Sequence, residues 1–148
     1  MRLCHCALAA VLLLVGACAH GGPSGGVDDS GMMEQQARRA GVYDYDGVVA
    51  KAASGDADAM HELFRITPQI TGEPANEQSS NLVGVLGDVG DGRFAGALVK
   101  EDAVTREAVG DAIEGWIYRK SSGKTTQQVN AQFKKAFPRT WRAAFKGE

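Results

Sequence analysis

The fold is decided by residues 102–117, which read DAVTREAVGDAIEGWI. Apolar residues recur there every three or four positions, as they do on one side of an α-helix. The residues expected on adjoining inward faces are Val104, Ala108, Ala112, Ile113, Trp116 and Ile117. Asp102 stands just before this pattern, where its short side chain can cap the first backbone N–H groups. The stretch therefore predicts a long, partly buried helix.

The same helical period extends in both directions from this stretch. Upstream, Asp56 is expected to cap a helix that Pro68 ends, Pro74 to stand in the first turn of another, and Asp91 to begin a short one. The inward residues expected on these helices and on one around residue 48 are Val48, Val49, Ala52, Ala57, Met60, Leu63, Phe64, Leu82, Val83, Leu86, Phe94, Ala97 and Leu98.

Downstream, Thr125 and Gln128 have the spacing of a capping box. The helix that they open carries Val129, Phe133, Ala136 and Phe137, and a last short helix carrying Trp141 and Phe145 follows Pro138. No stretch alternates with period two. We therefore expect an all-α domain over residues 43–148, a small bundle of stacked short antiparallel helices.

Residues 86–98 (LGDVGDGRFAGAL) and 105–113 (TREAVGDAI) together resemble a HEAT repeat, with Thr105 in place of the usual valine. Residues 48–66 could form a degenerate second copy. Because a solenoid needs about three repeats to bury a continuous core, the resemblance implies only a small group of HEAT-like α-α hairpins. It also implies a scaffold that binds other proteins.

The N-terminal residues have the organisation of a secretory signal: Arg2, an apolar run over residues 4–15, then small residues. The run is shorter than the roughly 20 residues of a membrane-spanning helix. Val15-Gly16-Ala17-Cys18 resembles the lipobox of bacterial lipoproteins. The resemblance implies cleavage between Ala17 and Cys18 and attachment of diacylglycerol and a further acyl chain, such as palmitate, to Cys18. Several acyl chains give stable anchoring, which one chain does not.

Three segments follow from this: a signal peptide over residues 1–17, a lipidated cysteine with a flexible, glycine-rich tether over residues 18–42, and the helical domain. In a Gram-negative host, Ala19 after the cysteine implies an outer-membrane protein that faces the periplasm. Cys4 and Cys6 lie in the segment to be removed. The domain therefore has no cysteine for a disulfide, for thiol catalysis or for a metal site.

The sequence shows no catalytic or metal-binding constellation. His61 is the only histidine of the domain. Glycine-rich residues 84–92 lack the preceding strand of a dinucleotide-binding loop, and residues 88–99 lack the ordered ligands of an EF-hand. We expect no cofactor, metal or catalytic residue. An enzyme that acts on peptidoglycan or lipid through carboxylates remains an alternative, with Glu62, Glu101, Glu107 and Glu114 available.

Charge is divided between two segments. Residues 43–118 hold fourteen acidic and five basic residues, whereas residues 119–148 hold one acidic and eight basic residues. Lys134, Lys135, Arg139, Arg142 and Trp141 are candidate contacts for an anionic lipid, lipopolysaccharide or acidic protein. Alternatively, the interleaved aromatic residues form a core stripe and the cations are solvated or complement the acidic segment. Nucleic acid is not expected as a partner of an exported protein.

These features favour a membrane-anchored envelope lipoprotein, not an enzyme, whose domain binds another envelope macromolecule. An inhibitor or immunity-type protein and an assembly accessory are two forms of this hypothesis. A module that binds anionic lipid through the basic segment is the electrostatic alternative.

Overall fold

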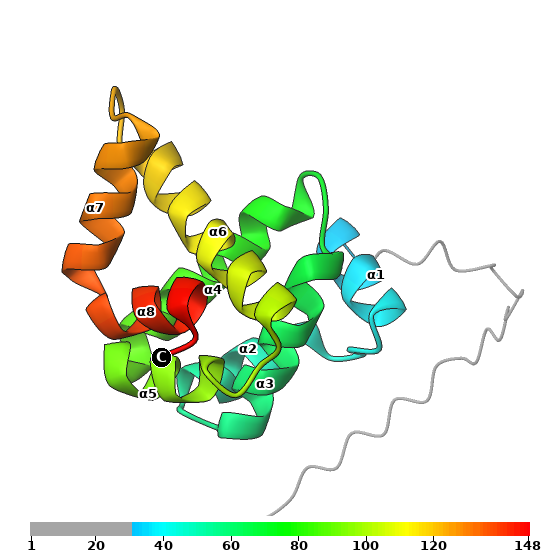
Figure 1. Ribbon diagram of the computed structural model, residues 1–148. Coiled ribbons are helices and arrows are strands. Elements are labelled where there is room, and N and C mark those ends of the chain that lie inside the picture. The colour runs from blue at the N-terminus through cyan, green and yellow to red at the C-terminus, as the bar shows by residue number, and fades with distance from the viewer. Residues whose placement is uncertain (1–30) are drawn as a thin grey trace, which may run out of the picture.

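The computed structural model describes residues 31–148, which form eight α-helices and one 3-10 helix, with no β-strand in that range (Figure 1). The elements are α1 (Met32–Arg39), α2 (Tyr45–Ala53), α3 (Ala57–Ile66), η1 (Thr67–Gln69), α4 (Pro74–Val89), α5 (Asp91–Leu98), α6 (Ala103–Lys120), α7 (Thr126–Ala136) and α8 (Pro138–Lys146). The predicted all-α bundle is confirmed. Over the described residues, no helix combines the length and the apolar character needed to cross a membrane.

Two of the predicted helix starts are made by side-chain caps. The Asp56 carboxylate accepts a hydrogen bond from the Ala59 N–H at 3.0 Å and starts α3. The Asp102 carboxylate accepts one from the Thr105 N–H at 2.9 Å and starts α6. Each cap satisfies a backbone donor that has no partner inside its helix.

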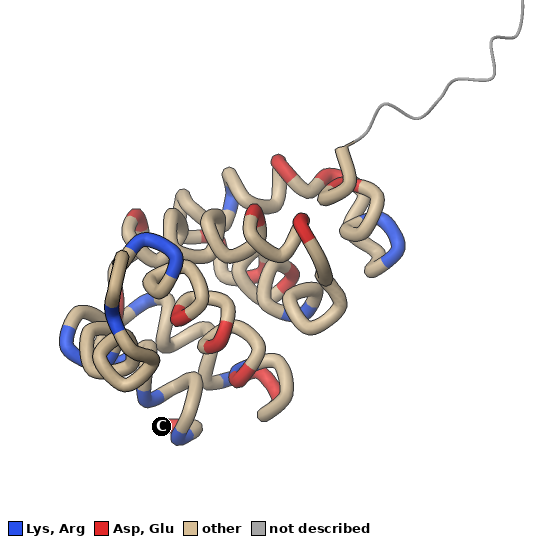
Figure 2. Tube along the Cα trace, turned by 90° about the horizontal axis from the view of Figure 1, so that it is seen from above, with Lys and Arg blue, Asp and Glu red and all other residues tan. Residues whose placement is uncertain are grey.

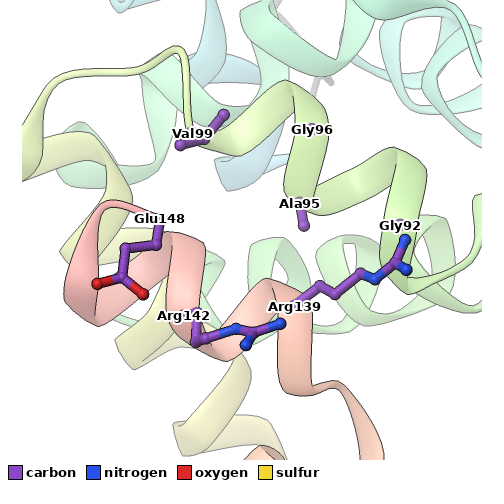
Figure 3. Close-up of a pocket in the computed structure, with 7 residues that line it drawn as sticks. All are labelled: Gly92, Ala95, Gly96, Val99, Arg139, Arg142 and Glu148. Carbon is purple, nitrogen blue, oxygen red and sulfur yellow. The ribbon is translucent and has the colours of Figure 1, made fainter.

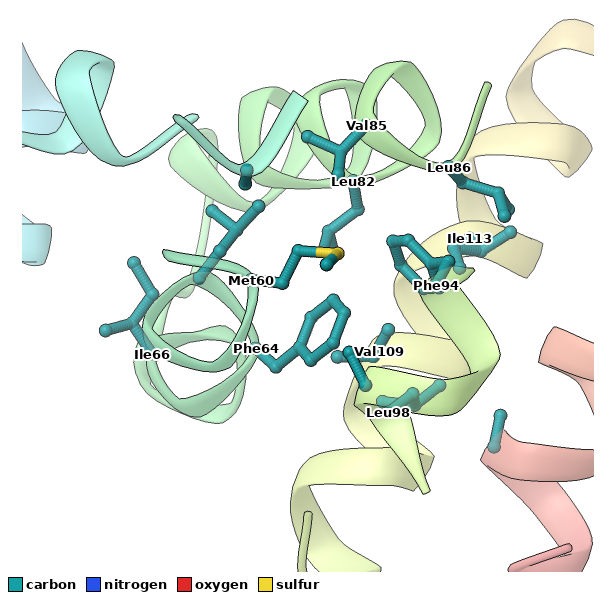
Figure 4. Close-up of a cluster of buried hydrophobic side chains, with 14 of the residues drawn as sticks. Met60, Phe64, Ile66, Leu82, Val85, Leu86, Phe94, Leu98, Val109 and Ile113 are labelled. Carbon is teal, nitrogen blue, oxygen red and sulfur yellow. The ribbon is translucent and has the colours of Figure 1, made fainter. Parts of the chain in front are cut away.

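The core lies where α3, α4, α5 and α6 meet (Figure 4). Phe64 of α3 and Phe94 of α5 are fully buried and meet edge to face, with ring centroids 4.8 Å apart. Leu82 and Leu86 of α4 and Ile113 of α6 are also fully buried. Burial of each such side chain contributes about 1.5–3 kcal/mol to folding, so this cluster holds the four helices together.

Gly90 separates α4 from α5, with a φ of 81° that favours glycine. The break divides residues 86–98, the first part of the HEAT-like stretch, between these two helices. Helix α4 packs chiefly on α6, whereas α5 packs chiefly on α8. The two parts of that stretch therefore have different main neighbours.

The folded part begins earlier than the predicted boundary at residue 43. Met33 and Ala37 of α1 and Val42 after it are buried, and α1 packs on α4 and α2. The Gln36 side chain exchanges two hydrogen bonds with the Thr71 backbone, at 2.8 and 3.0 Å. The predicted tether thus extends at most to residue 31. Only two apolar residues of α1 face inward, too few to show a period in the sequence.

The inward face of α6 also differs from the prediction. Val104 is 69% exposed, whereas Thr105 is 4% exposed. The cap at Asp102 starts α6 so that Thr105, Val109 and Ile113 form one buried stripe along the helix. Val104 precedes this stripe by one position and points to solvent.

Candidate anion-binding site

Helices α7 and α8 carry the predicted binding residues, and local sequence defines both helices. The Gln128 N–H donates to the Thr125 hydroxyl at 3.3 Å, and the Thr125 N–H donates to the Gln128 side chain at 2.9 Å. This is the predicted capping box of α7. Phe137 links the two helices, and Pro138 takes the first position of α8, where its missing N–H costs nothing.

The aromatic residues of this segment form a core stripe. Phe133 is fully buried, and Phe137, Trp141 and Phe145 are half-buried. The Phe133 ring lies 6.4 Å from that of Phe137 and 6.3 Å from that of Phe145, and Trp141 lies 5.8 Å from Phe145. These rings hold α7 against α8 and against the rest of the bundle. Trp141 therefore serves mainly the packing.

The four predicted cations are exposed on these two helices. Lys134 and Lys135 lie on α7, and Arg139 and Arg142 lie on α8. The Lys134 ammonium lies 4.6 Å from the centre of the Trp141 ring, within the range of a cation–π contact. We call these four residues the basic face.

No residue of the basic face forms an ion pair with the acidic segment within the described residues. Within residues 31–148, the ion pairs are Arg38 with Glu34 and His61 with Glu101, so none involves a basic residue of 119–148. Figure 2 shows the Lys and Arg positions of α7 and α8 gathered at one end of the bundle. Of the two interpretations that the sequence left open, the core stripe holds for the aromatic residues. The cations remain available to an external anion.

Two cations of the basic face line a cleft between α5 and α8 with a volume of about 370 Å³. Arg139 and Arg142 come from α8, and small residues of α5 lie opposite them (Figure 3). The full lining is Gly92, Ala95, Gly96, Val99, Arg139, Arg142 and Glu148. We call this feature the α5–α8 cleft. Lys134 and Lys135 are not among its lining residues.

Gly92 allows the Arg139 side chain to lie close to α5. A Cβ atom at position 92 would lie 2.9 Å from the Arg139 Nη1 atom, which is too close for ordinary contact. The missing side chain therefore allows the guanidinium to lie beside the first turn of α5. Residues 92, 95 and 96 share one side of a helix, and this spacing can be read from the sequence. The sequence does not show that this side of α5 faces α8.

Two of the four candidate carboxylates bond to neighbouring side chains. Glu101 bonds to His61, and Glu114 accepts from the Asn130 amide. Burial, and then the nearby Glu107 carboxylate, raise the pKa of Asp111. Of the four predicted candidates, Glu62 lies on α3, Glu101 in the turn between α5 and α6, and Glu107 and Glu114 on α6. Within residues 31–148, no three His, Cys, Asp or Glu side chains are grouped to hold a metal ion.

A buried polar network lies elsewhere, between α2, α3 and α4. The Tyr45 hydroxyl donates to the Gln78 Oε1 atom at 2.6 Å, and the Gln78 Nε2 atom donates to the Thr67 hydroxyl at 2.8 Å and to the Leu63 carbonyl at 3.0 Å. Burial raises the pKa of Tyr45 to about 12. Because its polar atoms bond to one another, the network stabilises the fold.

No family model, no curated protein and no solved structure matches this chain. The predicted cleavage at Ala17 and lipidation at Cys18 lie outside the described residues. The site is therefore defined by geometry alone: an exposed basic face and a cleft that contains half of its charges.

Proposed function

We propose that the protein is a lipid-anchored envelope protein that binds an anionic macromolecule through the basic face, without chemistry of its own. The observation that carries the proposal is the absence of ion pairs on this face within the described chain, although an acidic segment precedes it. Four exposed cations on two rigid helices attract an anionic partner and orient it during association.

The anchor is the second element of the proposal, and it is supported by the lipobox-like residues at 15–18. In a Gram-negative host, Ala19 directs the protein to the outer membrane, facing the periplasm. A lipid anchor suits an inhibitor or immunity-type protein and an assembly accessory alike, because it concentrates a small binding domain at the membrane surface. The proposal accommodates either form.

The basic face lies at the far end of the bundle from the point where the chain enters it. In Figure 1, α1 and α7 stand at opposite ends, and in Figure 2 the entry of the chain and the C terminus are again on opposite sides. An anchor attached before α1 therefore leaves the basic face turned away from the entry point. This arrangement leaves the basic face accessible to a partner elsewhere in the envelope while the protein is anchored.

The test is co-purification of envelope components with residues 31–148, which contain the whole described core. We expect a stoichiometric partner that is lost at high salt, because exposed charges are screened. Reversal of Lys134, Lys135, Arg139 and Arg142 to Glu should abolish the interaction.

The matched control reverses four other exposed cations, Arg39, Lys51, Arg65 and Lys100, and changes the net charge by the same amount. This control should retain the partner. Equal loss in both variants would show that net charge, and not the basic face, governs binding. A partner that survives reversal of the basic face would refute the proposal.

A further inference from the structure

We infer that the α5–α8 cleft binds the phosphate ester of a polyol, such as a glycerophosphate or phosphosugar group. The inference rests on the proposed function, because it assigns a ligand chemistry to two of the four cations of the basic face. Its evidence is separate: the position of two guanidinium groups in a cleft of headgroup size.

The charge of the cleft favours a phosphate. Arg139 and Arg142 stand three residues apart on α8 and line the same cleft. Neither guanidinium forms an ion pair with a carboxylate of residues 31–148. A planar guanidinium donates paired hydrogen bonds to phosphate oxygens, which a lysine does not. Two such groups provide paired donors for the oxygens of a phosphate monoester, and with the Glu148 carboxylate they leave the cleft with one net positive charge.

The Asp91 carboxylate, at the start of α5, is already engaged by the backbone of α8. The Asp91 carboxylate accepts the backbone N–H groups of Arg139 at 3.0 Å and Thr140 at 2.8 Å. Asp91 thus holds the first turn of α8 against α5 through the backbone. This contact fixes the helix that carries both arginines before any ligand arrives, which lowers the ordering cost of binding.

The other walls indicate the rest of the ligand. Gly92, Ala95 and Gly96 leave space along α5, and Val99 adds an apolar contact. Glu148 contributes an acceptor that suits a ligand hydroxyl and disfavours a second anionic group. A volume of about 370 Å³ is at the lower end of small-molecule sites, which hold roughly 300–1,000 Å³. It suits a headgroup and not an acyl chain.

The experiment compares the protein with three variants by calorimetric titration with glycerol 3-phosphate. R139Q/R142Q removes the two charges of the cleft, and K134Q/K135Q removes the same charge outside it. G96L fills the cleft without changing charge: a Cβ at position 96 meets no atom within 4 Å, and Gly96 is exposed on α5. Thermal unfolding verifies that each variant is folded.

We expect R139Q/R142Q to weaken binding at least about tenfold, because hydrogen bonds from a charged donor to a phosphate are stronger than those from a neutral amide. G96L should weaken it similarly, and K134Q/K135Q should change it less than about twofold, as exposed charges outside a site contribute little. Equal losses in the two glutamine variants, with G96L unchanged, would overturn the cleft and leave the basic face intact. No binding of glycerol 3-phosphate by the parent protein would also overturn it, even if an envelope partner is captured.

Binding to vesicles distinguishes the two possible sources of the ligand, a lipid headgroup and a soluble phosphate ester. Phosphatidylcholine vesicles with and without phosphatidate are sedimented with the protein, in the presence and absence of glycerol 3-phosphate. Phosphatidate-dependent binding that glycerol 3-phosphate displaces would identify a lipid headgroup as the source. Titration with glycerol 3-phosphate without vesicle binding would identify a soluble phosphate ester. Vesicle binding that R139Q/R142Q and K134Q/K135Q weaken equally, and that glycerol 3-phosphate does not displace, would contradict the inference.

Discussion

Asp91 caps a helix to which it does not belong: its carboxylate accepts the backbone N–H of Thr140 at 2.8 Å, across 49 residues of sequence. Asp91 is the first residue of α5, and Thr140 lies in the first turn of α8. The N-cap residue of α8 is Phe137, whose side chain has no oxygen to accept a hydrogen bond. Asp91 supplies the missing acceptor and stands at the positive ends of two helices at once.

Asp91→Ala should destabilise the protein by about 1 kcal/mol, within the 0.5–2 kcal/mol typical of a lost N-cap. The measurement is urea unfolding at neutral pH. Asp88→Ala is the matched control, because Asp88 is exposed near the end of α4, and it should leave the free energy of unfolding unchanged or slightly higher. Equal effects of the two substitutions would show that the bond to α8 contributes nothing.

Gly110→Ala should destabilise the protein by about 1–3 kcal/mol, as overpacking of a core does. A Cβ at position 110 would lie 2.7 Å from the Phe145 ring and 2.9 Å from the Ala144 Cβ, where α6 crosses α8. Gly84→Ala is the control, since a Cβ there meets no atom within 4 Å. It should stabilise α4 by up to about 1 kcal/mol through helix propensity. Thermal and urea unfolding of both variants would reveal the opposite signs, and a stabilising Gly110→Ala would disprove the close crossing.

Stability should fall as the pH rises from 10 toward 12, because of Tyr45. An unfolded tyrosine ionises near pH 10, whereas the pKa of buried Tyr45 is about 12. The folded state therefore keeps its proton while the unfolded state loses it, and folding loses on the order of 2 kcal/mol over this window.

Tyr45→Phe tests this assignment by unfolding at a series of pH values. The variant should be less stable at neutral pH, because Gln78 and Asn81 lose their bonds to the hydroxyl, and its alkaline fall should be smaller than that of the parent. Tyr43→Phe removes a 77% exposed phenol and should keep the parent slope. A parent-like fall in Tyr45→Phe would assign the titration to other groups.

Cys18→Ser should release the protein from the membrane and abolish incorporation of labelled palmitate, because the serine hydroxyl cannot form the thioether. Stable anchoring depends on more than one acyl chain. Cys6→Ser keeps Cys18 and should be labelled and membrane-bound like the parent. Continued labelling of Cys18→Ser would show that the acyl group is attached elsewhere, and would refute lipid anchoring through Cys18.

Much of the fold follows from local rules. Asp56 and Asp102 start helices because a carboxylate satisfies N–H groups three residues on, a relationship contained within one turn. The burial of Phe64, Phe94 and Ile113 follows from their helical spacing. Val104 was predicted to face inward, but the buried stripe of α6 begins one position later, at Thr105, so Val104 is exposed.

The sequence by itself determined the helical class, most helix limits, the aromatic stripe of α7 and α8, and the surplus of positive charge near the C terminus. Each depends on residues a few positions apart, where backbone geometry sets the neighbours. Only the tertiary structure decided that Asp91 caps α8, that Arg139 lies beside Gly92, and that no carboxylate of the described chain pairs with the basic face. These relationships join helices far apart in the chain, and no local periodicity encodes which helices will meet.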